Sequence, residues 1–533
     1  MSLRSTVFFA GWGGDTEGFD AVPGVSTALA GNHNPVCVQV HELNFPHAEH
    51  LPPGDVTALD LAKLPYTELF WASPACPAWT DAKGKKRYFD QSNQYTLIED
   101  TELGIQIEDP TEARSRALIE QIPRYLRAMA GRGTPVLGGV MENVIQCRRW
   151  DRWDEWRRSI EEIGPGYEVA VIALNSMHAM PRVCSTAPQS RDRLYVMYWL
   201  KSLGRRPDLD KWLRPRAYCP NCDQVVDAVQ SWKQPGVEMG RYGRTGQYVY
   251  RCPRISCRNT VIEPFTTPAA TAIDWDLDPG QKIGERAKPL AAATLDRIRI
   301  GLEKYSGTPI LSPAGGTWRT AATPLTEPMP TRTTRETDAL VLPPMLVQTS
   351  KRSTQHARSA AAPMPTQTTR RELGLAIPPF LTSLRGGGSK KLVYGVDQPL
   401  ATFSASGFHH GLVSPPGADQ AREGLLVPYY RTGVARPVDE PMPTLTTRDR
   451  HGLLGVDPAR LLDECTFRML EPDEIRAGMA FRATYKPIGD KRTQAAGYGN
   501  AVTPPAAEVL GCALAEAITG EPIERFAREN DLG

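Results

Sequence analysis

A single thiol, Cys76, stands in the segment Ser73–Pro77, at the end of the short apolar run Glu68–Ser73. Such a run predicts a buried parallel strand, and open α/β sheets place their active sites at the carboxyl ends of such strands. A thiol there can act as a nucleophile, but a lone cysteine can also be a small buried apolar side chain. Both roles stay open for Cys76 when it is considered by itself.

Other polar side chains follow or precede apolar runs in the same way. Glu142 comes directly after the run 135–141, where a carboxyl beside a pocket can have a raised pKa and donate a proton; a solvated loop acid is the alternative. Gln189, Arg191 and Arg193 lead into another apolar run, and their alternation predicts that they share one face. A proton donor and three hydrogen-bonding side chains could therefore converge on one polar substrate.

Glycine-rich turns stand near both ends of the chain. The predicted strand Thr6–Ala10 runs into Gly11-Trp12-Gly13-Gly14, where the backbone can pass close to a ligand. This is not the dinucleotide pattern G-x-G-x-x-G, and a purely structural turn is the alternative. A second tight turn, 497–505, precedes the last predicted helix.

Four cysteines form two pairs that are separated by 29 residues, Cys219 with Cys222 and Cys252 with Cys257. Two such turns can bring four thiolates to one tetrahedral ion, so we expect a structural zinc site; free thiols or a disulfide are the alternatives. Arginines around the pairs could contact phosphates, or the module could serve only as a scaffold. These arginines are Arg241, Arg244, Arg251, Arg254 and Arg258.

The elements that must position these residues divide the chain into four segments. Residues 1–200 alternate short apolar runs with helical patterns, which is typical of a parallel α/β sheet. Residues 201–265 carry the paired cysteines, 266–460 are rich in Pro, Thr, Arg and Gly, and helical patterns return in 461–533. Pro-Met-Pro-Thr repeats begin near residues 328, 363 and 441, with a degenerate copy near 399. Their irregular spacing argues against a solenoid, and they are either DNA-facing loops or packing elements.

The bulk composition excludes some classes of protein. The chain has 533 residues and a net charge of only +2, so any nucleic-acid-binding surface must be local. It lacks an apolar stretch of about 18 residues and a signal peptide, so we expect a soluble, cytoplasmic protein without membrane association. Ten cysteines are too few for a disulfide scaffold of this length, and their thiols should be reduced, metal-bound or catalytic.

Taken in order, these segments resemble the motifs of the DNA cytosine-5 methyltransferase family. The resemblance covers residues 5–200 and 465–520. The repeats are also similar to those of methyltransferases that look phage-borne or actinobacterial. The matching segments are the turn at 9–14, Gly54-Asp55-Val56, the Cys76 loop, Glu142-Asn143-Val144, Gln189–Arg193 and Gly499–Val502.

The resemblance implies a catalytic role for four residues. Cys76 would add to C6 of a flipped cytosine, and Glu142 would hydrogen-bond or protonate ring N3. Arg193 would hold the cytosine O2, while Arg191 would support the loop or bind a phosphate. The methyl donor would be S-adenosylmethionine, held by Phe9, Gly11, Gly13, Gly14, Asn32, His33, Asp55 and Asn500.

The implied fold is a Rossmann-like, S-adenosylmethionine-dependent α/β sheet made by residues 1–200 and completed by 461–533. A loop-rich target-recognition domain (266–460) and a small zinc ribbon (201–265) would be added to it. We expect a monomer that acts on double-stranded DNA. The alternatives are the same chemistry on RNA, or a homologue that binds DNA without modifying it.

The chain departs from the family pattern at the sites that matter most. Pro77 stands where relatives carry Gln after the nucleophile. Asn32 replaces the acidic residue that holds the cofactor ribose, and His33 stands where an adenine-stacking aromatic is usual. An amide binds ribose hydroxyls more weakly than a carboxylate does, so these departures bear on cofactor affinity.

Overall fold

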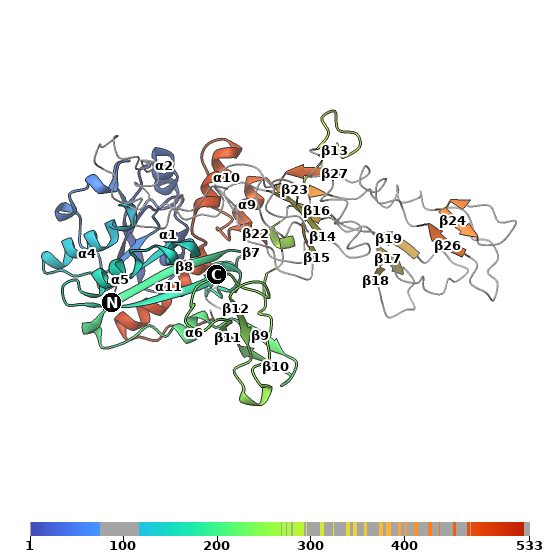
Figure 1. Cartoon of the computed structure of the whole chain (residues 1–533). Coiled ribbons are helices and arrows are strands. Elements are labelled where there is room, and N and C mark those ends of the chain that lie inside the picture. Colours follow the sequence, from blue (N-terminus) through green and yellow to red (C-terminus); the bar gives the residue numbers. More distant parts are fainter. Residues whose placement is uncertain are drawn as a thin grey trace, which may run out of the picture.

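The computed structural model of the chain describes residues 2–74, 117–267 and 471–526 (Figure 1). It also describes shorter stretches between 269 and 295, and the backbone of the strands between 310 and 469. The expected Cys76 loop lies mostly outside the described residues, which resume the chain at residue 117.

A seven-stranded sheet forms the centre of the molecule, in the order β3-β2-β1-β4-β5-β8-β6. All neighbouring strands are parallel except β8, which runs antiparallel to both β5 and β6. The strands are β1 (Leu3–Phe8), β2 (Val25–Gly31), β3 (Glu49–His50), β4 (Leu69–Ala72), β5 (Gly138–Asn143), β6 (Tyr167–Asn175) and β8 (Asp192–Leu200).

The reversed strand β8 corrects the expectation of a fully parallel sheet. Residues 176–191, between β6 and β8, contain only a 3₁₀ turn and the two-residue strand β7 (Gln189–Ser190). A parallel connection needs a crossover element, usually a helix, so this connection returns the chain antiparallel to β6. As a result, the start of β8 lies beside the carboxyl end of β5.

The central strand β4 is apolar throughout because both faces of the sheet are covered. Side chains alternate between two cores: Leu69 and Trp71 face one, and Phe70 and Ala72 face the other. Helices α1 (Gly14–Asp20), α6 (Leu209–Leu213) and α11 (Pro504–Thr519) cover the first face. Helices α4 (Gln121–Gly131) and α5 (Trp153–Glu161) cover the second, where Trp150, Trp153 and Trp156 are buried.

Helices α1 and α11 pack unusually closely, although one begins at residue 14 and the other at 504. A Cβ atom added to Gly18 would lie 2.4 Å from the carbonyl oxygen of Pro504 and 2.5 Å from the Cβ of Ala507. The absence of a side chain at Gly18 therefore sets the distance between the two helices.

We expect Gly18→Ala to lower the free energy of unfolding by about 1–3 kcal/mol, because the backbone of α11 must move to admit one methyl group. Denaturant unfolding measures this change. The matched control is Gly131→Ala at the end of α4, where nothing lies within 4 Å of the new Cβ atom. Equal stability of the two variants would contradict the packing described here.

The C-terminal helices α9 (Pro472–Gly478), α10 (Lys491–Asn500) and α11 complete this part of the fold. Among the described residues, Lys491–Thr519 is the one helical segment long and apolar enough to cross a membrane by length and composition. Its apolar window is 94% buried inside the protein, as expected for a helix that packs in a core. Helix α2 (Pro35–Asn44) lies between β2 and β3 and is capped by Asn34.

A small module with its own core follows α6. Its four strands form two hairpin-like pairs, β9 (Arg216–Cys219) with β10 (Gln224–Asp227) and β11 (Val229–Trp232) with β12 (Tyr248–Arg251). Its buried residues surround the four paired cysteines. We call residues 216–265 the cysteine module.

The remaining assigned strands are short and mostly antiparallel, and they lie mainly between 281 and 469. They are β13 (Gln281–Lys282), β14 (Ile310–Pro313), β15 (Thr323–Pro324), β16 (Thr337–Val341), β17 (Met345–Gln348), β18 (Ala357–Ser359), β19 (Leu373–Ala376), β20 (Phe380–Leu384), β21 (Val393–Gly395), β22 (Leu400–Ala401), β23 (His410–Val413), β24 (Leu425–Pro428), β25 (Arg436–Pro437), β26 (His451–Leu454) and β27 (Thr466–Met469).

The sheet order confirms the expected fold class, an α/β Rossmann-like mixed sheet. The strand order changes direction between β1 and β4. In open α/β sheets, ligands bind at such a switch point, outside the carboxyl ends of the strands. The turn after β1 and the loop after β4 therefore border the expected binding crevice.

Candidate active site and metal centre

The start of the Cys76 loop is held in place from three directions, although Cys76 itself lies outside the described residues. The Ser73 backbone N–H donates to the carbonyl oxygen of Phe8 at 3.2 Å, and the indole Nε1 of Trp71 donates to the Ser73 hydroxyl at 2.8 Å. The side-chain amide of Asn143 donates to the carbonyl oxygen of Pro74 at 3.2 Å. This last bond joins the predicted nucleophile loop to the Glu-Asn-Val segment at the end of β5.

Glu142 and Arg193 form an ion pair at the same edge of the sheet. The Arg193 Nε lies 2.9 Å from the Glu142 Oε1, and each side chain is only 11% exposed. The pair is possible because Glu142 ends β5 while Arg193 begins the antiparallel strand β8, in which Tyr195 is the residue opposite Glu142. Such a sheltered pair can hold a carboxyl and a guanidinium toward a polar ring.

Gln189 and Arg191 contact the C-terminal segment, whereas Arg193 contacts Glu142. The Arg191 guanidinium donates to the carbonyl oxygens of Gly499 at 3.2 Å and Ala501 at 3.0 Å. The Gln189 amide donates to the carbonyl oxygen of Gly478 at 3.3 Å. The chain is in strand conformation before and after Arg191 but not at that residue, which interrupts the simple alternation.

Asp15 is a buried carboxyl in this region that the sequence analysis did not single out. Its side chain is 1% exposed at the start of α1, and it accepts hydrogen bonds from the backbone of Thr16 and from the Ser73 hydroxyl. Burial raises the pKa of Asp15 to about 8, and the negative charge of Glu142 adds to this effect. The one sequence signal that could have indicated Asp15 is the presence of a carboxyl residue directly after the glycine-rich turn.

We expect Asp15→Asn to change how stability depends on pH. The raised pKa means that the folded state holds the Asp15 proton more tightly than the unfolded chain does. The stability that this proton contributes is complete below the unfolded pKa near 4 and is lost as pH rises through about 8. Relative to Asp15→Asn, the wild-type protein should lose up to about 1.4 kcal/mol per pH unit in that window.

Denaturant unfolding of both proteins at several pH values between 5 and 9 measures this difference. Asp490→Asn is a control of opposite sign, because a hydrogen bond from Thr493 lowers the pKa of Asp490 at the start of α10. Wild-type stability should rise relative to that variant as pH increases through the acidic range. If the free energy of unfolding changed with pH in the same way for the wild type and Asp15→Asn, the raised pKa of Asp15 would be contradicted.

The turn after β1 combines an open position with two tightly packed ones. Gly11 has a φ of 53°, and a Cβ atom there would meet only the Phe9 carbonyl oxygen, at 3.8 Å. Gly13 has a φ of 72°, and its Cβ atom would overlap the ring of Phe45; a Cβ on Gly14 would overlap the Val502 carbonyl. Thus Gly11 leaves space for a ligand, whereas Gly13 and Gly14 are required by packing.

Phe9 has a φ of 60°, in the left-handed region that side chains rarely adopt. Residues held in this conformation cluster at functional sites, which fits the place of Phe9 beside the switch point.

Two predicted cofactor-binding segments lie together at the ends of β2 and β3. The Gly54 backbone N–H donates to the Asn32 carbonyl oxygen at 3.4 Å, which brings Asn32 next to Asp55. The Asn32 side chain accepts from the Asn34 backbone at 3.0 Å, and the Asp55 side chain accepts from the Thr57 backbone at 3.0 Å. Asn32 and Asp55 are half-buried, and His33 is exposed.

The C-terminal segment packs directly on the turn after β1. A Cβ atom on Gly497 would lie 1.9 Å from the Trp12 ring, and the Tyr485 hydroxyl donates to the Trp12 carbonyl oxygen. Asn500 ends α10 with its side chain exposed. The predicted segments at 9–14 and 497–502 are therefore neighbours.

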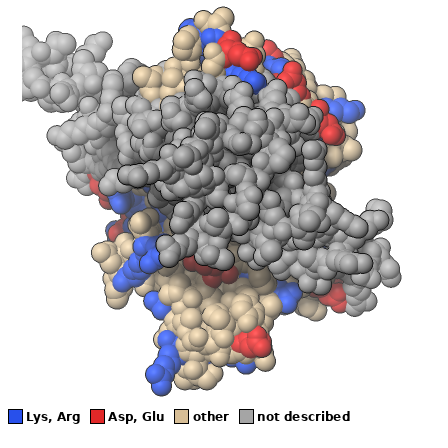
Figure 2. Space-filling view, turned by 90° about the vertical axis from the view of Figure 1, so that its right-hand side faces the viewer, with Lys and Arg blue, Asp and Glu red and all other residues tan. Residues whose placement is uncertain are grey.

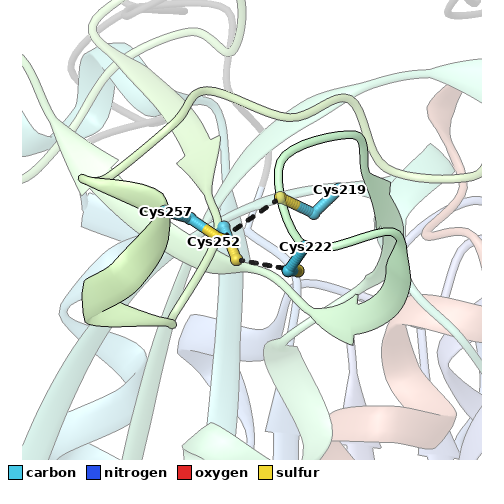
Figure 3. A group of neighbouring side chains, drawn as sticks. All are labelled: Cys219, Cys222, Cys252 and Cys257. Carbon is cyan, nitrogen blue, oxygen red and sulfur yellow. Dashed lines mark hydrogen bonds between the residues drawn. The ribbon is translucent and has the colours of Figure 1, made fainter.

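The four paired cysteines meet at one point in the cysteine module (Figure 3). All four Sγ atoms lie within 4.8 Å of one another, with 3.8 Å between those of Cys219 and Cys257 and 4.0 Å between those of Cys222 and Cys252. A tetrahedral zinc ion with Zn–S bonds of about 2.3 Å requires S···S distances of about 3.8 Å. The four thiols are unbridged, and their number and spacing fit one structural zinc ion.

The chemistry of the ligand set supports this fit. Burial opposes ionisation of these coupled thiols and raises the pKa of Cys222 and Cys257, but hydrogen bonds from the backbone N–H groups of Cys222 and Asn221 help to lower the pKa of Cys219. Thiolates are the form that binds zinc. Because protein atoms supply all four ligands, the ion would be structural rather than hydrolytic.

The arginines of the cysteine module divide between internal and exposed positions. Arg251 donates to the Ser231 hydroxyl and to the Asn259 carbonyl oxygen, whereas Arg244 and Arg258 are exposed. On the face shown in Figure 2, described Lys and Arg side chains are interspersed with Asp and Glu. The described atoms of that face therefore form no continuous basic area.

Comparison with known proteins gives similarity only to solved structures, since no family model and no curated protein matches the chain. A methyltransferase of Entamoeba histolytica, EhMeth, is 10% identical over 98% of each chain, with a TM-score of 0.42. A candidate DNA modification methyltransferase encoded within an Escherichia coli prophage is 12% identical over 98% of this chain and all of the other, with a TM-score of 0.40.

A triple mutant of DNMT2 from Spodoptera frugiperda is 13% identical over 97% of this chain and all of the other, with a TM-score of 0.41. At these identities and TM-scores, the function of this chain must be inferred from its own residues.

Proposed function

We propose that this protein is a DNA cytosine-5 methyltransferase that uses S-adenosylmethionine as its methyl donor. One arrangement carries the proposal: the ion pair of Glu142 with Arg193 beside the hydrogen bond from Asn143 to Pro74, two residues before Cys76. It brings the segment expected to hold the nucleophile next to the expected proton donor, at the carboxyl edge of the sheet.

The residues of the chain would divide the chemistry as follows. Cytosine C5 is a poor nucleophile, so the Cys76 thiolate first adds to C6 while Glu142 delivers a proton to N3. S-adenosylmethionine, when bound, supplies the methyl group that C5 takes up. A water molecule then takes the C5 proton, and return of the N3 proton to Glu142 restores the ring and expels the Cys76 thiolate. Arg193 would orient Glu142 and the O2 edge of the base.

The cofactor would occupy the crevice beside β1. The open position at Gly11 supports this placement, as does the proximity of Asn32 to Gly54 and Asp55. Arg191 would act indirectly, because its guanidinium supports the carbonyls of Gly499 and Ala501 and so fixes the segment that packs on the glycine-rich turn.

A direct assay tests the proposal. The wild-type protein and Cys76→Ala are incubated with labelled S-adenosylmethionine and either duplex DNA or RNA, and the nucleosides are analysed by mass spectrometry. We expect 5-methylcytosine in DNA with the wild type alone, and a covalent adduct of the wild type with DNA that contains 5-fluorocytosine. Label in RNA only would select the RNA alternative, and no product on any substrate would refute the enzyme assignment.

A further inference from the structure

Asp192 stands between the two predicted catalytic arginines, and its carboxylate is bound by Asn175 at the end of β6 and by the cysteine module. The side chain is 6% exposed. Its Oδ1 accepts from the Asn175 side-chain amide at 3.0 Å, and the same amide donates to the Ser190 hydroxyl at 2.8 Å. The Asn175 Oδ1 in turn accepts from the Arg191 backbone N–H at 2.9 Å.

The same carboxylate is bound from the other side by the cysteine module. The Tyr242 backbone N–H donates to Asp192 Oδ1 at 3.2 Å, and the Tyr248 hydroxyl lies 3.5 Å from that oxygen. Tyr248 is fully buried and begins β12, the strand that leads directly into Cys252. The position of this tyrosine therefore depends on the strand that carries a predicted metal ligand.

A packed aromatic cluster makes this connection rigid. The His178 ring contacts the rings of Tyr242 and Tyr250 edge to face, with centroid distances of 4.4 and 4.9 Å. His178 belongs to the turn after β6, and its side chain is 2% exposed. Aromatic pairs in this geometry stabilise a packing beyond the area that they bury.

We propose that Asp192 is a positioning residue that couples the four-cysteine centre to the candidate active site. The coupling runs from Cys252 through β12 to Tyr248 and Tyr242, and from there to Asp192 and the backbone of Arg191 and Arg193. A folded cysteine module fixes Asp192, whose own carbonyl oxygen accepts from the Arg193 guanidinium at 2.9 Å. The effect on turnover rests on the proposed function, but the structural coupling does not.

Amide hydrogen exchange with mass spectrometry tests the coupling in the full-length protein. Two variants weaken the link while leaving all four cysteines in place: Asp192→Asn and Tyr248→Phe. The matched control is Tyr218→Phe, because the Tyr218 hydroxyl also donates to a carboxylate, that of Asp223 at 2.7 Å, but on the exposed outer strand of the same module. Zinc content is measured for every protein.

We expect both link variants to retain zinc and to exchange about tenfold faster or more at residues 189–193, with β2 unchanged, because a bond to a charged acceptor is weakened. Chelation of zinc from the wild type should give the same local change. In the methylation assay kcat should fall about tenfold to a hundredfold while KM for S-adenosylmethionine stays constant, since the arginines shift but the cofactor crevice does not.

Unchanged exchange at 189–193 after chelation, or equal behaviour of Tyr248→Phe and Tyr218→Phe, would overturn the coupling. Neither the exchange nor the zinc measurement needs a substrate. An inactive wild type with the expected exchange pattern would therefore refute the proposed function and support the coupling. An active wild type with no exchange response would support the proposed function and refute the coupling.

Discussion

Glu142→Gln should lower kcat for cytosine methylation by a factor of about 10² to 10⁴, the usual contribution of a positioned general acid. The amide keeps the shape of the side chain but cannot deliver a proton to N3, so addition of the Cys76 thiolate to C6 loses its driving force. Single-turnover methylation and the rate of adduct formation with 5-fluorocytosine DNA both report this step. DNA affinity should change little.

The substitution also removes the counter-ion of Arg193, so its effect on stability must be separated from its effect on catalysis. Glu168→Gln is a matched control, because Glu168 pairs with Arg206 at 2.8 Å at the opposite end of the sheet, where both side chains are more exposed. Thermal unfolding is recorded for both variants. Adduct formation by folded Glu142→Gln at the wild-type rate would refute the role of Glu142.

Cys252→Ser should abolish metal binding and unfold the cysteine module. Structural zinc contributes about 10–16 kcal/mol to the folding of such small units, and the buried core of this module surrounds the four thiols. We expect one zinc per chain in the wild type and well under one in the variant. Backbone exchange in β9–β12 should rise to the level of an unfolded segment.

Cys37→Ser is the matched control for this experiment. Cys37 is a half-buried free thiol in α2, outside the four-cysteine group. The variant should keep its zinc and its exchange pattern. Less than one zinc per chain in carefully prepared wild-type protein would show that the geometry of the four thiols serves another purpose.

The sequence predicted the elements with strong apolar patterns and could not predict those without one. The apolar runs before the Cys76 loop and before Glu142 correspond to β4 and β5, because continuous apolar runs leave a clear pattern in the sequence. Strand β2 was missed because Val25–Gly31 contains Ser, Thr and Gly among small apolar residues. The antiparallel direction of β8 depends on how residues 176–191 fold, which periodicity does not reveal.

The candidate site was predictable where it depends on motifs and unpredictable where it depends on contacts between distant segments. The four cysteines were found from spacing alone, and the structure brings them together. The different contacts of Arg191 and Arg193 were not predictable. Arg191 binds the carbonyls of Gly499 and Ala501, which lie some 310 residues away in the sequence. Asp15 was missed for the same reason, since the Ser73 hydroxyl and the Glu142 charge that act on it come from segments far away in the sequence.

The close packing of α1 against α11 has a consequence for the order of events during synthesis. All seven strands of the sheet have been made once Leu200 is added, but α11, the longest of the three helices on its face, begins only at Pro504. At 5–20 residues per second, the ribosome needs about 15–60 s to make the residues between them. During that time the apolar surface on which α11 later packs lacks this helix. Folding in the cell must therefore either form the sheet after α11 has been made or keep this surface bound by another molecule until then.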